Sequence, residues 1–256
     1  MLTPEQLQQF KDDGVLVLHD FFSPQEIDRW RCEVECFYEH PDSYEGWRKA
    51  LDEYAPGKFK CKEMPTPVNH LKLSMLLHFF NKDVKWEGTQ EFIPKKPNIT
   101  GDWLGANTPH LDFPVNPPMR FLINTTFYLD NMMPYNAPFM YWKGSHKIAW
   151  DYFRQKPEEY GTGTYLQQQQ TFKNITDLMQ KDPIAFTGRS GDLLIWNPFL
   201  LHSPSANISY NPRFAFIGRW GTKVHSHELY SVFSGDMWRS WYNLATATPE
   251  ISKMVK

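Results

Sequence analysis

The sequence has little cysteine and no long apolar segment. Its three cysteines, Cys32, Cys36 and Cys61, are an odd number and form no disulfide framework. No apolar run has the length of a membrane span, and the polar N-terminus lacks the apolar stretch of a signal peptide. We therefore expect a cytoplasmic protein in a reducing compartment, without a membrane partner.

An excess of charge of one sign is also missing. Lysine and arginine together number 27, against 29 aspartate and glutamate residues. A surface without a strong field of one sign does not attract nucleic acid or an anionic membrane. We expect a small-molecule substrate and no nucleic-acid partner, and the sequence leaves the oligomeric state open.

Glycine is sparse, with 14 residues against 20 prolines, whereas aromatic residues make up 16% of the chain. This composition favours a β-rich fold with many turns over a helical bundle. The length of 256 residues suggests one large domain with a substantial core.

Local signals predict the elements of the N-terminal part. Thr3 with Gln6, and Ser23 with Glu26, have the spacing of capping boxes, and Gly14 is a helix end. An apolar run without clear periodicity can be a helix or a buried strand. The expected elements are helices over 4–13 and 24–38, a strand over 15–18, an irregular excursion over 40–66 with a short helix at 47–54, and a helix or buried strand over 71–80.

From about residue 103 the sequence changes to short apolar runs separated by proline, glycine and asparagine. Short strands at this density predict an antiparallel sandwich or barrel. The polar segment 148–180 predicts a surface excursion or lid with little sheet content. The expected strands are 103–108, 121–129, 139–141, 184–186, 192–196 and 213–220.

His110 and Asp112 form a His-x-Asp pattern. Residues i and i+2 of an extended backbone point to the same face, so both side chains can converge on one ion while Leu111 faces away. Two imidazoles and one carboxylate leave three metal positions open, as in non-haem Fe(II) oxygenases. The pattern alone is weak evidence, because a turn with a capped histidine also produces it.

Support comes from His202 and from Arg213, eleven residues later. The turn formers in 204–212 can reverse the chain and return Arg213 beside the strand that bears His202. A guanidinium there can bind the far carboxylate of a metal-chelating 2-oxo acid at two points. Arg219 has the same strand parity and is the rival for this role; we interpret it as a second pocket charge or a rim residue near Trp220.

The sequence resembles the phytanoyl-CoA dioxygenase family of Fe(II)/2-oxoglutarate oxygenases. The resemblance is carried by LTPEQLQQFKDDGVLVLHDFFSPQEID, HLD, NAPFMYWKGSHK and GDLLIWNPFLLHSPSANISYNPRFAF, in the family's order. It implies an α+β, mainly β fold: a double-stranded β-helix (a cupin-like jelly roll) with N-terminal helices packed on one sheet. It also implies His110, Asp112 and His202 as Fe(II) ligands, Arg213 as the 2-oxoglutarate anchor, and Thr126 in the wall of the cofactor pocket.

We expect a single domain over 1–256. Its parts are a helical support over 1–100, a jelly-roll core over 101–222 with the excursion at about 148–180, and a C-terminal segment over 223–256. Phe113, Tyr141 and Trp142 are candidates for the substrate site, with core packing as the alternative for each. We interpret His146 as structural, and His225 with His227 as part of a solvated terminal segment.

The resemblance implies a dioxygenase that oxidises an unactivated C–H bond of a natural-product or amino-acid-like molecule, using O₂ and releasing succinate and CO₂. Hydroxylation is expected, with desaturation or another oxidative rearrangement left open. Asp112 argues against a halogenase, in which a small residue replaces this carboxylate. The alternative is a cupin-type isomerase or binding protein, which needs the metal ligands but not Arg213.

Overall fold

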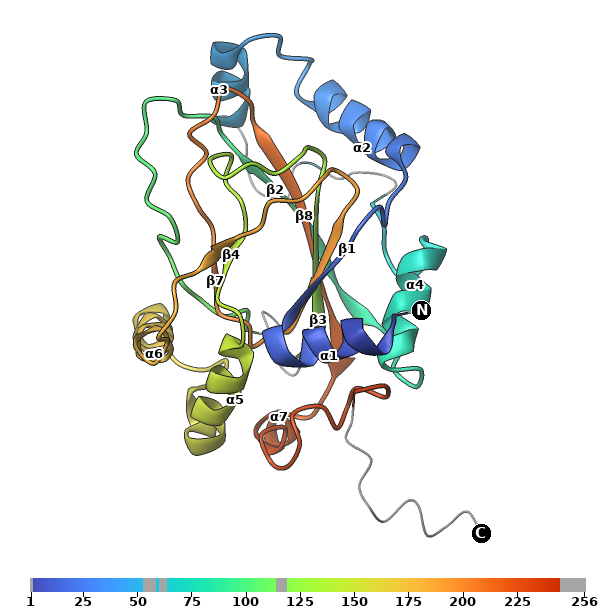
Figure 1. The fold of residues 1–256 in the computed structure, drawn as a ribbon, viewed down its shortest axis with the longest axis vertical. Coiled ribbons are helices and arrows are strands. Elements are labelled where there is room, and N and C mark those ends of the chain that lie inside the picture. The colour runs from blue at the N-terminus through green and yellow to red at the C-terminus, as the bar shows by residue number, and fades with distance from the viewer. Residues whose placement is uncertain (1, 53–58, 60–63, 114–118, 245–256) are drawn as a thin grey trace.

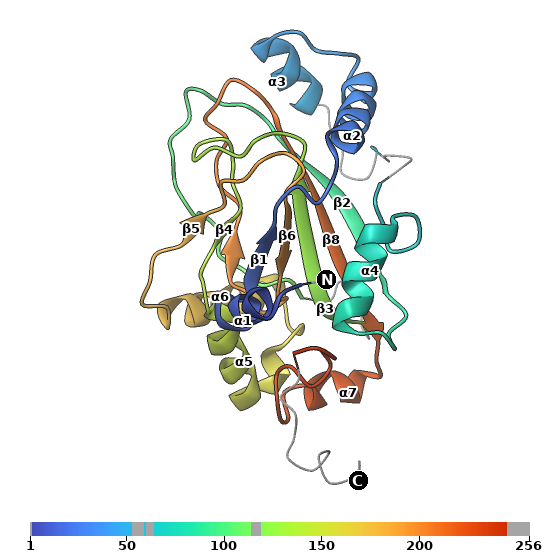
Figure 2. The ribbon, with the colours of Figure 1, turned by 45° about the vertical axis from the view of Figure 1, so that its right-hand side comes forward.

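The computed structural model describes residues 2–52, 59, 64–113 and 119–244. Two antiparallel sheets face each other, with strand orders β1-β6-β3-β8-β2 and β5-β4-β7. Figure 1 shows the smaller sheet beside the larger one, and Figure 2 shows the strands of the larger sheet side by side. The strands are β1 (Val15–Leu18), β2 (Glu87–Lys95), β3 (Met119–Tyr128), β4 (Met140–Tyr141), β5 (Ile184–Ala185), β6 (Leu193–Trp196), β7 (His202–Ser203) and β8 (Arg213–Lys223).

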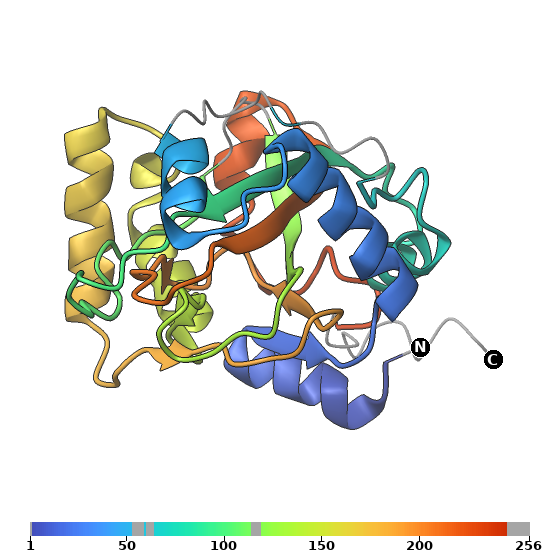
Figure 3. The same cartoon turned by 90° about the horizontal axis from the view of Figure 1, so that it is seen from above.

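Helices cover the outside of this barrel. They are α1 (Pro4–Asp13), α2 (Pro24–Phe37), α3 (Tyr44–Asp52), α4 (Leu71–Phe80), α5 (Ser145–Gln155), α6 (Tyr165–Asp177) and α7 (Ser226–Ser231), with a short 3₁₀ turn at Pro157–Glu159. Seen from above in Figure 3, α6 and α4 lie on opposite sides of the strands. No helix in the described part of the chain is both long enough and apolar enough to span a membrane.

Alternation along β8 separates an outer core from the barrel interior. Phe214, Phe216 and Trp220 pack outward against the N-terminal helices, whereas Ala215 and Ile217 face inward between the sheets. Successive side chains of a strand point to opposite faces, so the parity of a residue decides which space it enters. The jelly roll with helices packed on one sheet confirms the predicted fold class.

The outer core is built from large side chains on several helices. Phe10 of α1, Trp30 of α2 and Phe80 of α4 are each at most 1% exposed. They join the outward-facing residues of the larger sheet in one apolar cluster. Burial of this area anchors the helices, because transfer of apolar surface from water contributes about 25 cal/mol per Å².

The predictions for the first helices are confirmed. Thr3 with Gln6 and Ser23 with Glu26 form complete capping boxes, and Gly14 ends α1 with a left-handed φ of 75°. Segment 71–80 is the helix α4 rather than a strand. The short helix expected at 47–54 begins earlier, at Tyr44; its last two positions and much of the excursion lie outside the described residues.

One strand prediction was wrong, and one strand was missed. Segment 103–108 forms no strand: Gly105 has a φ of 59°, and the Thr108 amide donates to a side chain, Ser203 Oγ, at 2.9 Å. Conversely, β2 was missed because its sequence is polar and contains Pro94. It is the edge strand beside β8, where a missing amide donor is tolerated.

The segment 148–180 has little sheet content, as predicted, and most of it is helical. Phe153 of α5 and Phe172 of α6 are buried in a second apolar cluster with Phe233, which follows α7. Trp238 and Trp241 then join the outer core. The C-terminal segment therefore bridges two cores as far as the described residues extend.

Candidate metal centre

Backbone pairing holds His110 and His202 opposite each other. The His110 amide donates to the His202 carbonyl at 2.8 Å, and the His202 amide donates back at 3.1 Å. Side chains of such an antiparallel pair lie on the same face. The two rings are accordingly only 4.3 Å apart between centroids.

Each imidazole also has its tautomer fixed by a backbone carbonyl. His110 Nδ1 lies 2.8 Å from the Thr108 oxygen, and His202 Nδ1 lies 2.9 Å from the Leu200 oxygen. A carbonyl only accepts, so Nδ1 carries the proton and Nε2 keeps a lone pair free for a metal. Burial is the main cause that lowers the pKa of His202 to about 3, and the neighbouring His110 adds to the shift. The His202 ring is therefore neutral.

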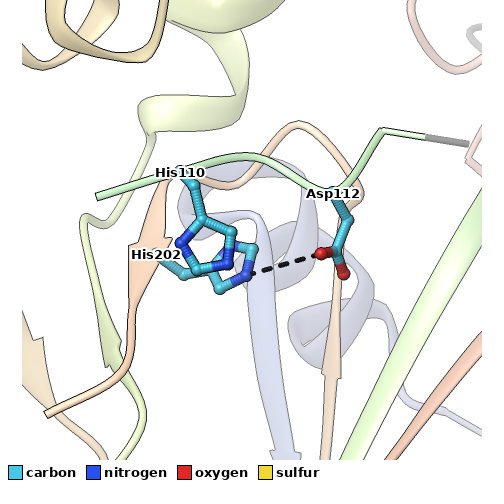
Figure 4. Close-up of side chains that lie close together, drawn as sticks. All are labelled: His110, Asp112 and His202. Atoms are coloured by element: carbon cyan, nitrogen blue, oxygen red, sulfur yellow. Dashed lines mark ion pairs between the residues drawn. The ribbon is translucent and has the colours of Figure 1, made fainter. Parts of the chain in front are cut away.

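Asp112 completes the group. His110, Asp112 and His202 each offer one ligand atom, and these atoms lie within 4.8 Å of one another (Figure 4). Leu111 between the first two is buried in the cluster around α5 and faces away from them. The described residues contain no other group of three or more metal-binding side chains in such an arrangement.

Arg219 and Asn124 hold the Asp112 carboxylate. Arg219 Nε donates to Oδ2 at 2.7 Å and Nη2 donates to Oδ1 at 3.2 Å, while Asn124 Nδ2 donates to Oδ2 at 3.1 Å. Burial acts to raise the pKa of Asp112, but Arg219, with His202, outweighs it and the pKa is lowered. The carboxylate is therefore ionised and oriented without a metal.

Arg213 lies on the same face of β8 in a different environment. It is 5% exposed, donates from Nη1 to the Ile93 carbonyl at 3.0 Å, and lies over the Tyr128 ring at 5.4 Å. Its Nε has no hydrogen-bond partner, and it makes no ion pair with any residue that the structure describes. Burial lowers the pKa of this guanidinium, with the Tyr128 phenol opposing the shift.

The residues around Arg213 suit an anion. Lys95 is the cross-strand partner of Arg213, and burial, together with Arg213, lowers the pKa of this lysine. Between Arg213 and Arg219 the inner face of β8 carries only Ala215 and Ile217. A buried cation without a counter-charge is costly, so the buried Arg213 and the partly buried Lys95, beside uncharged side chains, fit the distal carboxylate of 2-oxoglutarate.

The expected path of the chain to Arg213 was wrong. β7, which carries His202, pairs with β4, whereas β8 pairs with β2 and β3 in the opposite sheet. Asn207 directs the crossing: its side chain donates to the carbonyls of Lys95 and Asn211. Arg213 therefore enters the barrel from the sheet opposite that of His202 rather than from the neighbouring strand.

The remaining candidates occupy different positions. Thr126 is fully buried on the inner face of β3, and its hydroxyl accepts the Trp196 indole N–H at 3.1 Å. Tyr141 pairs with His202 in register and stacks on Phe139 at 5.9 Å between the sheets. Trp142 packs instead into the cluster around α5.

Phe113 lies between the metal ligands and the helical excursion. Its ring is 5.1 Å from Phe172 of α6 and 5.3 Å from Tyr160, and Phe172 is itself 6.4 Å from the His110 ring. A change at Phe172 of α6 is thus one ring contact away from the His110 imidazole. Outside the site, His146 is buried with Nε2 on the Lys11 carbonyl at 3.1 Å.

His225 and His227 take no part in this site. His225 is the N-cap residue of α7, with Glu228 completing its capping box, and the two rings stack at 5.7 Å. Both residues are exposed.

Sequence reasoning missed the contact of Arg219 with Asp112 and the roles of Asn124 and Glu91. Asn124 is opposite Arg219 in the β3–β8 register, and Glu91 lies on β2, the other neighbour of β8. Strand parity was the available signal: Asn124 shares its face with Thr126, as Arg219 does with Arg213. Strand parity predicts which face of the sheet a side chain lies on, but not which side chain it contacts there.

A jelly-roll barrel in which two histidines and one carboxylate converge has the ligand set of the mononuclear non-haem Fe(II) oxygenases, in which three protein ligands would leave positions for co-substrates. Within that class the chain belongs to the phytanoyl-CoA dioxygenase family, whose model matches residues 10–215. It is an Fe(II)/2-oxoglutarate-dependent oxygenase with O₂ as the second co-substrate. Family membership decides against the alternative of a cupin-type protein without oxygenase activity.

Individual relatives are distant. Ectoine dioxygenase of Nocardia farcinica is 24% identical over 231 residues, which cover 82% of this chain and 74% of that protein. Among solved structures, the non-haem α-ketoglutarate-dependent carbocyclase SnoK from nogalamycin biosynthesis has a TM-score of 0.55 and 15% identity, covering 86% of this chain and 84% of its own. HygX from Streptomyces hygroscopicus, with nickel and 2-oxoglutarate bound, has a TM-score of 0.52 and 17% identity over 87% of both chains. The structural likenesses show the fold alone.

Proposed function

We propose that His110, Asp112 and His202 hold the Fe(II), that Arg213 binds the distal carboxylate of 2-oxoglutarate, and that the enzyme oxidises an unactivated C–H bond of a small molecule. The observation that carries this assignment is Arg213: a buried guanidinium without an ion-pair partner among the described residues, in the same barrel as the three ligands. A metal site alone does not need such a cation.

The groups around the site have different roles. The backbone carbonyls of Thr108 and Leu200 keep both Nε2 atoms available to the metal. Arg213 and Lys95 neutralise the co-substrate's distal charge, and the apolar barrel wall excludes water. When bound, Fe(II) with 2-oxoglutarate supplies the oxidising power, with succinate and CO₂ as co-products.

We infer a natural-product or amino-acid-like substrate. Ectoine dioxygenase and the carbocyclase SnoK are relatives whose names describe action on small molecules. The near balance of charge supports the same class over a nucleic acid or other polyanion. Hydroxylation is the proposed reaction, and Thr126, Phe113 and Tyr141 are proposed to line the pocket.

Anaerobic spectroscopy tests the site. Fe(II) and 2-oxoglutarate added to the protein should produce a weak visible charge-transfer band, and succinate should be released on admission of O₂ with a substrate from a small-molecule panel. Arg213→Met should weaken the band through 2-oxoglutarate affinity while Mn(II) binding stays intact. Absence of the band in the wild-type protein would overturn the site assignment.

A further inference from the structure

The Asp112 carboxylate is held asymmetrically. Oδ2 accepts from Arg219 Nε at 2.7 Å and from Asn124 Nδ2 at 3.1 Å, whereas Oδ1 accepts only from Arg219 Nη2, at 3.2 Å. Each carboxylate oxygen offers two lone-pair sites, so Oδ2 is filled and Oδ1 keeps one site. Oδ1 is also the oxygen nearer His202, 3.9 Å from its Nε2.

We propose that Arg219 is a positioning residue that restricts Asp112 to one metal-binding oxygen, Oδ1. This inference rests on the proposed function of the three ligands. If both oxygens chelated the metal, they would occupy a position that 2-oxoglutarate and O₂ need, because these require three open positions between them. Occupation of Oδ2 by two donors prevents that chelation.

The geometry of Arg219 suits this role. Its fork is planar and rigid, so two donors fix the plane of the carboxylate as well as its charge. The third nitrogen, Nη1, donates to Glu91 Oε2 at 2.9 Å. Glu91 lies on β2 and Asn124 on β3, the two neighbours of β8, so three adjacent strands fix the guanidinium and its carboxylate.

A purely structural role for Arg219 makes a different prediction. Arg219 is 13% exposed at its side chain and links strands through two acidic groups. If Arg219 only stabilised the fold, its removal would disorder Asp112, and metal affinity and stability would both decrease. If it restricts Asp112, its removal should leave metal binding intact and change how Asp112 binds.

Arg219→Met separates these cases, because it removes the donors but keeps an unbranched side chain. We expect a Mn(II) dissociation constant within about threefold of wild type or tighter by titration calorimetry, against the loss of roughly 10-fold to 100-fold expected for a partner that only supports the ligand. The 2-oxoglutarate affinity, from the Fe(II) charge-transfer band, should be weaker by about tenfold or more, which is about 1.4 kcal/mol. A crystal structure of the Mn(II) form should show both Asp112 oxygens on the metal, against Oδ1 alone in wild type. Arg219→Lys, which restores the charge but not the fork, should be intermediate in 2-oxoglutarate affinity.

Two controls complete the experiment. Arg213→Met should also weaken 2-oxoglutarate binding but leave Asp112 bound through Oδ1 only. Asn124→Ala removes one donor from Oδ2 and should weaken 2-oxoglutarate binding by only about twofold to threefold. If Arg219→Met does not fold, the Lys variant and Asn124→Ala carry the test.

Loss of Mn(II) binding in a folded Arg219→Met protein, or unchanged 2-oxoglutarate affinity with Asp112 still bound through one oxygen, would overturn the inference. Failure of the wild-type protein to bind Mn(II) would instead overturn the proposed function. The two failures are therefore distinguishable in one set of titrations.

Discussion

The two arginines on the inner face of β8 differ in their partners: one is paired with carboxylates of the protein, and the other is not. Arg219 has carboxylates on both sides, Asp112 and Glu91, whereas Arg213 has none among the described residues. Burial acts to lower the pKa of both, but Asp112 reverses the effect for Arg219, whose pKa is raised. Arg219 is thus paired with carboxylates within the described chain, whereas Arg213 is a buried guanidinium without one.

The difference follows from position along the strand. Arg213 and Arg219 are six residues apart, roughly 20 Å along an extended strand. The loop that carries Asp112 reaches only the later residue. The guanidinium of Arg219 therefore holds Asp112, whereas Arg213, at the far end of the same face, has no carboxylate partner among the described residues and is proposed to bind the co-substrate.

The largest effect is expected from Asp112→Ala. The change removes a metal ligand and leaves Arg219 with only the half-exposed Glu91. Turnover, measured as succinate release, should fall by at least about 10³-fold, and the free energy of unfolding should decrease by about 3 kcal/mol, as for a broken buried pair. Chemical denaturation checks the second value. Asp130→Ala, which breaks the partly exposed pair with Arg31, should cost less than about 1 kcal/mol.

If Asp112→Ala had wild-type stability, Arg219 would not depend on Asp112 for its burial. The two arginines would then differ in their hydrogen-bond partners but not in how much those partners contribute to stability.

Arg213→Met should leave stability unchanged or raise it, whereas Asp112→Ala should lower it. The KM for 2-oxoglutarate should rise about 150-fold, since loss of a buried charge partner costs about 3 kcal/mol in binding. The folded protein loses an unpaired buried cation, so thermal denaturation should show a melting temperature equal to or above wild type. Lys95→Met should raise the same KM by about fivefold at most, because Lys95 is only partly buried. An unchanged KM in Arg213→Met would assign the anchor to another residue.

Sequence alone predicted what depends on short spacing. The capping boxes at Thr3 and Ser23 are local, and the i, i+2 relation of His110 and Asp112 needs only extended backbone. His202 was found because an apolar strand precedes it and because the chain resembles a known family. These signals lie within a few residues of each other or within a recognisable motif.

What the sequence could not give is long-range pairing. Arg219 and Asp112 are 107 residues apart, and parity could not tell whether the guanidinium meets a carboxylate or an empty space. The same limit explains the error over β7 and β8: a turn-rich segment predicts a reversal but not whether the chain returns to the same sheet. β2 was missed because an edge strand needs neither strong alternation nor a full set of donors.

Comparison of the arginine variants needs a pH at which the fold itself does not titrate. Burial, above all, lowers the pKa of His146 from 6.5 to about 4, so the folded protein resists its protonation while the unfolded chain does not. The stability that comes from His146 is therefore complete above about pH 6.5 and is lost as the pH falls towards 4; between pH 7.5 and 5 this loss should be about 2 kcal/mol. Burial also lowers the pKa of His202, so this residue should add to the loss over the same pH range. Urea denaturation at both pH values measures the sum. His146→Gln should reduce the loss by about 2 kcal/mol, and an equally steep dependence in that variant would assign it to other groups.

The smallest effect is expected from Glu91→Gln, which weakens the outer contact of Arg219 and leaves its contacts with Asp112. The Glu91 side chain is 46% exposed, so the pair with Arg219 is screened by solvent and contributes less than about 1 kcal/mol. We expect kcat/KM to fall by about twofold to fivefold, with Mn(II) affinity unchanged. Glu87→Gln is the matched control, because Glu87 lies four residues earlier on the same face of β2 and pairs with Lys223 at 3.3 Å. An effect of Glu91→Gln as large as that of Arg219→Met would show that the outer contact, rather than the fork on Asp112, determines how the ligand is held.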